Sequence, residues 1–323
     1  MQASLNTWNG WTQNPSGIYV PQKQKCKRPR RLQAVDLFAG CGGFSLGVEA
    51  SGIDVVAAVE WWEVAATTYL ANLGHRNGCV VGYVDDDVDR ERFEKELARA
   101  GKRSGNKALW SSGRWVGMHR SPDCDMGCRA FLFGDAAKAT GDYILDMLRA
   151  APGGWHESDK VDLVIGGPPC QGMSKASGRA KPTDPRNNLI LEYLRLVSEL
   201  DAQMFVMENV PPLLEGGKFR DLRDAYFARA GELGYDLAAN IINAANYNVP
   251  QTRRRAIIVG HKKGTDPYSF PMPHTWSMRV EDGQLVTDML TRDRPNKNDD
   301  DNESTTEVEP GEASPAADQM EMF

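Results

Sequence analysis

The sequence predicts an α/β fold built on a doubly wound, mostly parallel, seven-stranded sheet. Between residues 33 and 262, short apolar runs rich in Val, Ile, Leu and Phe alternate with segments of helical periodicity. Three of these runs end in Gly or Asp, at the carboxyl ends of strands where open α/β sheets bind ligands. Such alternation is typical of strand–helix–strand units, which build a parallel sheet with helices on both faces.

Seven strands and five helices follow in order from these patterns. The strands are expected at 33–40, 54–61, 130–135, 161–167, 203–210, 235–243 and 254–261. The helices are expected at 44–51, 63–73, 140–150, 186–200 and 217–233. The connection from about 75 to 129 is longer than one helix and two loops require, which predicts a long insert after the second strand–helix unit.

Composition divides the chain into three regions. Residues 1–32 are polar and include the basic run KQKCKRPRR, which predicts an extended arm, either a solvated leader or a set of phosphate contacts. Residues 33–292 form the main domain, and the acidic, weakly hydrophobic segment 293–323 predicts a disordered tail. Residues 298–323 contain nine acidic residues and no Lys or Arg, whereas the whole chain has a net charge of −6. The rest of the chain is therefore mildly basic, with a net charge of −6 + 9 = +3, which fits a nucleic-acid partner.

The sequence does not favour membrane or secretory functions. No apolar stretch approaches the roughly 20 residues that cross a bilayer, and the first residues lack the pattern of a signal peptide. Six cysteines in 323 residues do not form a disulfide framework, so a reducing cytoplasm is expected. Four residues of the insert could assemble a zinc site, but their spacing is not standard, and ordinary cysteines are the favoured interpretation. These residues are His75, Cys79, Cys124 and Cys128.

Three successive strand ends predict a cleft for a nucleoside-containing cofactor. The segment VDLFAGCGGFSLG at 35–47 places a glycine-rich turn between a strand and a helix, where backbone N–H groups can approach a ligand closely. The next strand ends in Glu60, a position suited to holding ribose hydroxyls, and Trp61 can stack on an adenine ring. The third strand ends at Asp135, which is available for the adenine amino group.

A second group of reactive side chains follows the later strands. Cys170 lies in GGPPCQGMS, on a loop restricted by two prolines directly after an apolar strand, where a thiol is presented at a fixed angle. Glu208 ends the next strand, so its carboxyl is expected at the same edge of the sheet and could donate a proton. In QTRRR, alternation along a strand puts Gln251, Arg253 and Arg255 on one face.

In this order and at these strand ends, DLFAGCGG, PPCQ, ENV and QTRRR resemble the motifs of the C5-cytosine DNA methyltransferase family, over roughly residues 33–262. TDPRNNL, with Asp184, Arg186 and Leu189, resembles a further motif of that family. The resemblance implies a Rossmann-like, S-adenosylmethionine-dependent catalytic domain over 33–292 and attack on a cytosine flipped out of the duplex. It makes S-adenosyl-L-methionine the expected cofactor and DNA the expected partner.

The resemblance also implies the role of each matching residue. Cys170 would add to C6 of cytosine, because covalent addition makes C5 nucleophilic enough to accept a methyl group. Glu208 would bind and protonate N3, while Arg255, with Arg253 beside it, would hold the cytosine carbonyl and Glu208. The implied cofactor site comprises Asp36, Phe38, Gly40, Cys41, Gly42, Gly43, Glu60, Trp61, Asp135 and Pro169. The implied substrate contacts are Gln171, Ser174, Asn209 and Gln251.

Target recognition is the part of the family pattern that this sequence departs from. Members continue past the arginine motif into a target-recognition domain and a final Asn-containing motif. Here VTDML at 286–290 resembles the segment that introduces that domain, and the acidic tail follows. Recognition would come from a separate subunit, or from the insert together with the basic arm. A poorly active relic is the third interpretation, and the intact Cys170, Glu208 and Arg255 argue against it.

The predicted function is therefore methylation of cytosine C5 in DNA, for restriction–modification or phage self-protection. The expected location is the cytoplasm and nucleoid of a bacterial or phage-infected cell, with no membrane partner. Two alternatives stay open: a nonenzymatic regulatory subunit that binds DNA or cofactor, and methylation of cytosine in RNA. An amino-group methyltransferase is disfavoured, because GPPCQ carries a thiol where those enzymes have an aromatic residue.

Overall fold

The computed structural model describes most of residues 31–271 and several short strands before and after them. The described ranges are 31–75, 77–104, 110–111, 114–115, 125–156, 159–169, 184–215 and 217–271, with strands at 7–8, 11–13, 19–21, 276–281 and 284–289. Cys124, Cys170, Gln171, Ser174 and the tail predicted for 293–323 lie outside these ranges.

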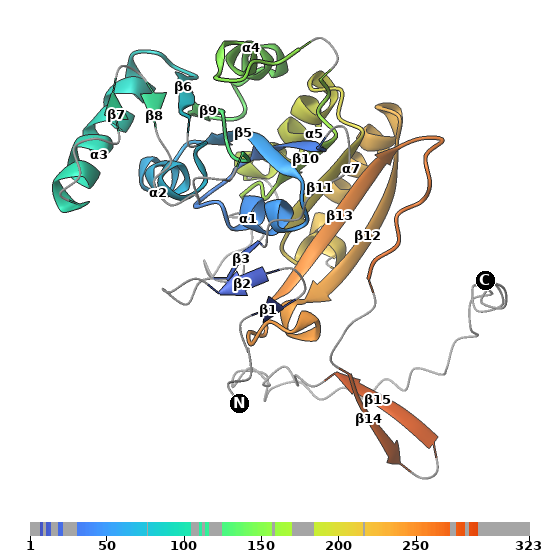
Figure 1. Ribbon diagram of the computed structural model, residues 1–323. Coiled ribbons are helices and arrows are strands. Elements are labelled where there is room, and N and C mark those ends of the chain that lie inside the picture. Colours follow the sequence, from blue (N-terminus) through green and yellow to red (C-terminus); the bar gives the residue numbers. More distant parts are fainter. Residues whose placement is uncertain are drawn as a thin grey trace, which may run out of the picture.

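A ten-stranded sheet runs through the centre of the described part of the chain (Figure 1). Its middle consists of six parallel strands in the order β11 (Met204–Asn209), β10 (Leu163–Gly166), β4 (Gln33–Leu37), β5 (Asp54–Glu60), β9 (Ala130–Phe133) and β6 (Cys79–Tyr83). Antiparallel strands β13 (Arg254–Lys262) and β12 (Tyr235–Asn243) continue the sheet beyond β11. The short strands β8 (Arg114–Trp115) and β7 (Trp110–Ser111) continue it beyond β6. The predicted α/β class is confirmed, and all seven expected strands belong to this sheet.

Helices cover both faces of the sheet, as the doubly wound prediction requires. One face packs against α4 (Gly141–Ala150), α5 (Leu189–Glu199) and α7 (Arg220–Glu232). The other packs against α1 (Gly43–Ala50), α2 (Glu63–Leu73) and α3 (Val88–Ser104). All seven residues of β5 are buried, because a parallel strand in the middle of such a sheet meets apolar side chains on both sides.

The five expected helices are present, with small differences at their starts. α5 begins at Leu189 because the preceding residues form a 3-10 helix, η3 (Pro185–Asn188), whose N-terminus is capped by the Asp184 side chain. α7 follows the short helices α6 (Pro212–Glu215) and η4 (Gly217–Phe219). A last 3-10 helix, η5 (Ala244–Tyr247), lies between β12 and β13.

Part of the segment predicted as an insert belongs to the core. β6 pairs in parallel with β9, and α3 packs on the same side of the sheet as α2. Neither element was predicted from the sequence, because β6 contains Gly82 and follows the polar run GHRNG, and α3 consists mostly of charged residues. The β7–β8 pair, also within this segment, forms the outer antiparallel edge of the sheet beside β6.

Two further small sheets were not predicted. β1 (Thr7–Trp8), β2 (Trp11–Gln13) and β3 (Tyr19–Pro21) form an antiparallel sheet within the region expected to be an extended arm. β14 (Trp276–Glu281) and β15 (Gln284–Met289) form an antiparallel hairpin, and β15 contains most of the VTDML segment.

Thr140 caps the N-terminus of α4, and its loss has a predictable cost. Its Oγ1 accepts a hydrogen bond of 3.2 Å from the backbone N–H of Tyr143. Replacing Thr140 by Ala removes this acceptor, so we expect the free energy of unfolding to fall by about 1 kcal/mol in urea titrations. Thr140→Ser keeps the acceptor and should match wild type. An equal loss in both variants would assign the effect to the methyl group instead.

Candidate active site

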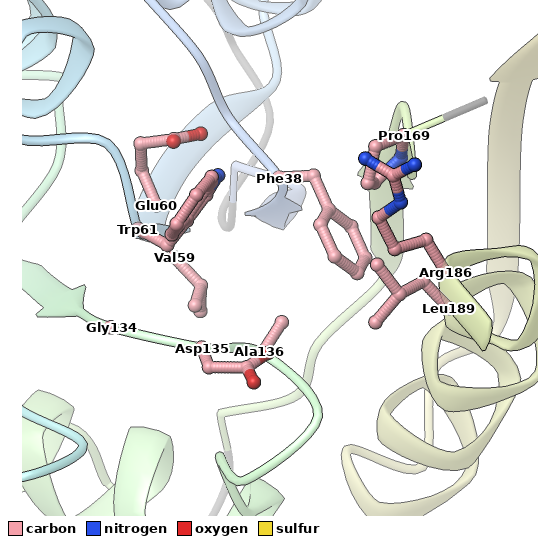
Figure 2. A pocket seen from close by; sticks show the side chains of 10 residues that line it. All are labelled: Phe38, Val59, Glu60, Trp61, Gly134, Asp135, Ala136, Pro169, Arg186 and Leu189. Carbon is pink, nitrogen blue, oxygen red and sulfur yellow. The ribbon is translucent and has the colours of Figure 1, made fainter. Parts of the chain in front are cut away.

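A cavity of about 430 Å³ opens at the carboxyl ends of the parallel strands, where α/β sheets bind their ligands. Its lining residues are Phe38, Val59, Glu60, Trp61, Gly134, Asp135, Ala136, Pro169, Arg186 and Leu189. Figure 2 shows Glu60 and Trp61 on one side of this cavity and Pro169, Arg186 and Leu189 on the opposite side. Residues from four strand ends and from the start of α5 therefore enclose one space.

The turn after β4 has a backbone that few residues adopt. Phe38 has a φ of 59°, which costs energy for a residue with a side chain, and Gly40 and Gly42 also have positive φ. A Cβ on Gly42 would lie 2.1 Å from Cδ1 of Leu73, so glycine is required there for α1 to approach α2. The turn presents the Phe38 side chain to the cavity.

Glu60 joins this turn to the end of β5. Its Oε2 accepts a 2.7 Å hydrogen bond from the N–H of Gly40, and its Oε1 accepts a 2.8 Å bond from the N–H of Trp62. Burial raises the pKa of Glu60, and the backbone hydrogen bonds oppose that rise. Glu60 therefore fixes the two strand ends together while its carboxylate still faces the cavity.

The segment after β9 forms another side of the cavity. Gly134 has a φ of 140°, and a Cβ there would lie 2.5 Å from Oδ2 of Asp89, which leaves no room for a side chain. The N–H of Gly134 donates to the backbone oxygen of Glu60 at 3.0 Å, so this segment is tied to β5. Asp135 is exposed, and its Oδ1 accepts a 3.0 Å hydrogen bond from the N–H of Ala137.

Glu208 and two arginines form a charged cluster at the ends of β11 and β13. Nε of Arg255 lies 2.6 Å from Oε1 of Glu208, and Nη2 of Arg253 lies 3.9 Å from the same oxygen. The Glu208 side chain is 30% exposed, so a ligand can reach the carboxylate. The antiparallel register of β11 and β13 sets Glu208 opposite Ile257. Arg255 is two residues from Ile257 along β13, so its side chain can reach the Glu208 carboxylate.

The loop after β10 links this cluster to the cavity. A Cβ on Gly167 would lie 3.3 Å from Oε2 of Glu208, whereas Pro169, two residues later, lines the cavity. Buried Asn209 donates from Nδ2 to the backbone oxygen of Pro168 at 3.3 Å and so holds this loop. The described residues before Cys170 therefore lie beside both the cavity and Glu208.

The expected cofactor residues differ in where the structure places them. Phe38, Glu60, Trp61, Asp135 and Pro169 line the cavity. The remaining five belong to β4 and the turn that follows it: Asp36, Gly40, Cys41, Gly42 and Gly43. Of these, Cys41 and Gly43 are exposed and Gly42 is buried against α2.

Asp36 lies beneath the turn. Its side chain is 1% exposed, and its Oδ2 accepts a 2.6 Å hydrogen bond from Oγ of Ser45, which is also 2.9 Å from the Tyr69 hydroxyl. Burial raises the pKa of Asp36 to about 7, and the nearby charge of Glu60 adds to the rise. Asp36 thus supports the turn from below rather than facing the cavity.

The remaining expected residues lie near the Glu208 cluster or outside the described ranges. Arg253 is exposed and donates its backbone N–H to Oδ1 of Asn243 at 3.0 Å, and Gln251 is exposed. Cys170, Gln171 and Ser174 stay predictions. Val59, Gly134 and Ala136 also line the cavity, although nothing in the sequence singled them out. They are ordinary strand-end residues, and the one signal that could have identified them is that they adjoin Glu60 and Asp135 in the sequence.

Arg186 and Leu189 were matched to a family motif without a role, and both line the cavity. Asp184 orients the arginine: its Oδ1 accepts from Nε of Arg186 at 2.9 Å, and its Oδ2 accepts from Nη2 at 2.6 Å. The spacing of the D-x-R pattern therefore fixes a guanidinium at the cavity.

The three described candidate zinc ligands do not gather around one point. Cys79 and Cys128 are fully buried with their sulfurs 3.8 Å apart, while Nδ1 of His75 accepts from the N–H of Asn77 at 3.1 Å. Within the described ranges, no group of three or more His, Cys, Asp or Glu side chains could hold a metal ion. The two sulfurs instead belong to the apolar core around α2.

The sheet topology and the position of the cavity define a class of proteins, namely α/β proteins with a ligand-sized cavity at the carboxyl ends of their parallel strands. The family profile for C-5 cytosine-specific DNA methylase matches residues 32–92 and 149–315. The chain belongs to this family.

Three curated type II methyltransferases illustrate the similarity. M.XorII of Xanthomonas oryzae is 32% identical over 74% of this chain and 42% of its own length. M1.HphI of Haemophilus parahaemolyticus is 32% identical over 76% of this chain and 50% of its own. M.AquIA of Picosynechococcus is 35% identical over 49% of this chain and 66% of its own. The chain spans about half the length of the first two relatives.

No helix within the described residues is long and apolar enough to cross a membrane.

Proposed function

We propose that this protein transfers a methyl group from S-adenosylmethionine to C5 of cytosine in DNA. The observation that carries the proposal is the position of the loop after β10. Its residues lie beside the cavity at Pro169 and beside the Glu208–Arg255 pair at Gly167. A base next to Cys170 would therefore meet both the methyl donor and a carboxyl group.

The cavity suits the adenosine half of the cofactor. Its volume of about 430 Å³ is in the range of small-molecule sites. Trp61 offers an aromatic face, Glu60 and Asp135 offer carboxylates for hydroxyl and amino groups, and Val59, Ala136 and Leu189 are apolar. When bound, S-adenosylmethionine supplies an electrophilic methyl group. These residues would hold the nucleoside, and Pro169 lines the same cavity just before Cys170 in the sequence.

The reactive residues act on the base. The Cys170 thiolate adds to C6, and the electron density this places on the ring makes C5 nucleophilic. Glu208 stabilises that adduct at N3, and the positive charge of Arg255, 2.6 Å away, keeps its carboxyl oriented. After methyl transfer has left S-adenosylhomocysteine, solvent water would accept the C5 proton, Glu208 would recover the proton it gave to N3, and the Cys170 thiolate would depart as the aromatic ring re-forms.

Covalent trapping on DNA that contains 5-fluorocytosine tests this proposal. Fluorine at C5 cannot leave as a proton does, so the enzyme should stay attached to the base and run as a shifted band on denaturing gels. Wild type with S-adenosylmethionine should form this adduct, and Cys170→Ser should not form it while still binding S-adenosylhomocysteine. Failure of wild type to form any adduct, alone or with a candidate partner, would overturn the proposal.

The same assay separates the alternatives. A nonenzymatic subunit would bind DNA or cofactor equally well as wild type and as Cys170→Ser, without any adduct. Structured RNA that contains 5-fluorocytosine would be trapped in place of DNA if RNA is the substrate. The separate recognition subunit stays a prediction, tested by adding candidate partner chains to the trapping reaction.

A further inference from the structure

We propose that Arg92 on α3 is a positioning residue that holds Trp61 as the aromatic wall of the cavity. The proposal rests on the proposed function in one respect, since it assumes that the cavity takes the adenosine part of S-adenosylmethionine. Arg92 itself is not among the described residues that line the cavity. It would act through Trp61.

The guanidinium of Arg92 contacts Trp61 in two ways. Its carbon lies 5.8 Å from the centre of the Trp61 ring, within the range of a cation–π interaction. Its Nη2 donates a 3.1 Å hydrogen bond to the backbone oxygen of Trp61. One side chain therefore restrains both the ring and the backbone at the end of β5.

Trp61 needs such a restraint, because it is 57% exposed. Aromatic side chains at half-exposed positions are not fixed by close packing, and a stacking platform binds a flat ligand best when its orientation is set beforehand. Packing against the core cannot fix the orientation of a ring that is more than half exposed. A planar guanidinium held over one face of the ring can fix that orientation.

Arg92 is itself held by two carboxylates from different elements. Its Nη2 lies 2.9 Å from Oε2 of Glu63 at the start of α2, and its Nη1 lies 3.2 Å from Oδ1 of Asp89 on α3. Asp89 is only 6% exposed and lies against Gly134, where a Cβ would be 2.5 Å from its Oδ2. The Asp89–Arg92 pair thus connects the Trp61 wall to the Gly134 side of the cavity.

The packing of α3 fixes the direction of the Arg92 side chain. Phe93, the next residue, is fully buried and packs against Phe133 in a tilted arrangement with ring centres 5.0 Å apart. The Arg92 guanidinium lies 5.4 Å from the same Phe133 ring, so it crosses from β9 to Trp61. Lysine would keep the charge but could not make the planar stacking and the separate hydrogen bonds together.

Binding of S-adenosylhomocysteine, measured by titration calorimetry, tests the proposal. Arg92→Met should weaken binding about fivefold, the value of one exposed cation–π contact and its orientation. In a Trp61→Ala background, the same substitution should have no further effect, because the ring through which Arg92 acts is gone. Arg90→Met is the matched control: Arg90 lies on the same helix with its guanidinium 4.7 Å from the Tyr83 ring centre, and neither residue is among the described lining residues.

A second measurement does not depend on the ligand. With 5-fluorotryptophan incorporated, the fluorine resonance assigned to Trp61 through Trp61→Phe should be narrow in wild type and shifted or broadened in Arg92→Met. Equal affinity and an unchanged resonance in Arg92→Met would overturn the role of Arg92, as would an equal loss in both Trp61 backgrounds. Absence of any binding by wild type would instead overturn the proposed function, and the resonance would still decide on Arg92.

Discussion

Replacing Glu208 by Gln is expected to lower kcat/KM for cytosine methylation by about 10²- to 10⁴-fold, the usual contribution of a positioned proton donor. The amide keeps the size and the hydrogen-bonding ends of the carboxyl group, but it cannot give up a proton to N3. It also lacks the negative charge that pairs with Arg255 at 2.6 Å before the base binds, so the side chain is held less firmly in position for the adduct. Both losses act on the covalent adduct, so the rate falls although the fold is kept.

The affinity for S-adenosylhomocysteine should change little in Glu208→Gln, since Glu208 is not among the described residues that line the cavity. Initial rates with labelled cofactor and calorimetric titration measure the two quantities separately. Glu215→Gln is the matched control, because Glu215 pairs with Arg254, the neighbour of Arg255, and has no place in the proposed chemistry. A rate within about threefold of wild type would exclude Glu208 as the proton donor.

Much of the fold could be predicted because its strands are long apolar runs. β5 and β10 consist of buried residues throughout, and such runs between glycine turns have few other structural interpretations. β6 could not be found in this way, because its residues include Gly82 and two half-buried positions and they follow a polar run. Its place at the side of β9 comes from tertiary pairing, which leaves no local signal.

Cavity residues were predictable where their chemistry is unusual at a strand end. Glu60, Trp61 and Asp135 differ clearly from the apolar residues before them, and each lines the cavity. Asp36 shows the limit of this reasoning, because it belongs to a glycine-turn motif and yet its side chain is buried beneath the turn. The position of a residue in a motif predicts that it lies near the site. Whether its side chain faces the site depends on the face of the strand to which it points.

Arg92 could not have been recognised from sequence, since its partners come from β5, α2, α3 and β9. A helix rich in Arg, Glu and Lys normally predicts a solvated surface, and most of α3 fits that description. Its relation to Trp61 arises from the way α3 packs beside α2 on the sheet.

Stability should depend on pH through Asp36. Burial raises its pKa to about 7 in the folded protein, against about 3.9 in an unfolded chain. Between these values the folded protein holds a proton that the unfolded chain has released. The stabilisation is therefore complete below about pH 4 and is lost as pH rises through 7. A shift of about three pKa units corresponds to a loss on the order of 4 kcal/mol across that window.

Urea titrations at pH 5, 6, 7 and 8 measure this dependence. Asp36→Asn cannot ionise, so its free energy of unfolding should fall less steeply than that of wild type over this range. Its absolute stability is not the test, because the amide brings a buried donor that Ser45 does not satisfy. Asp236→Asn, an exposed carboxylate on β12, should keep the wild-type slope. If Asp36→Asn and wild type lose stability in parallel from pH 5 to 8, the carboxyl group beneath the glycine turn is ionised throughout, and another group such as Glu60 must account for the slope.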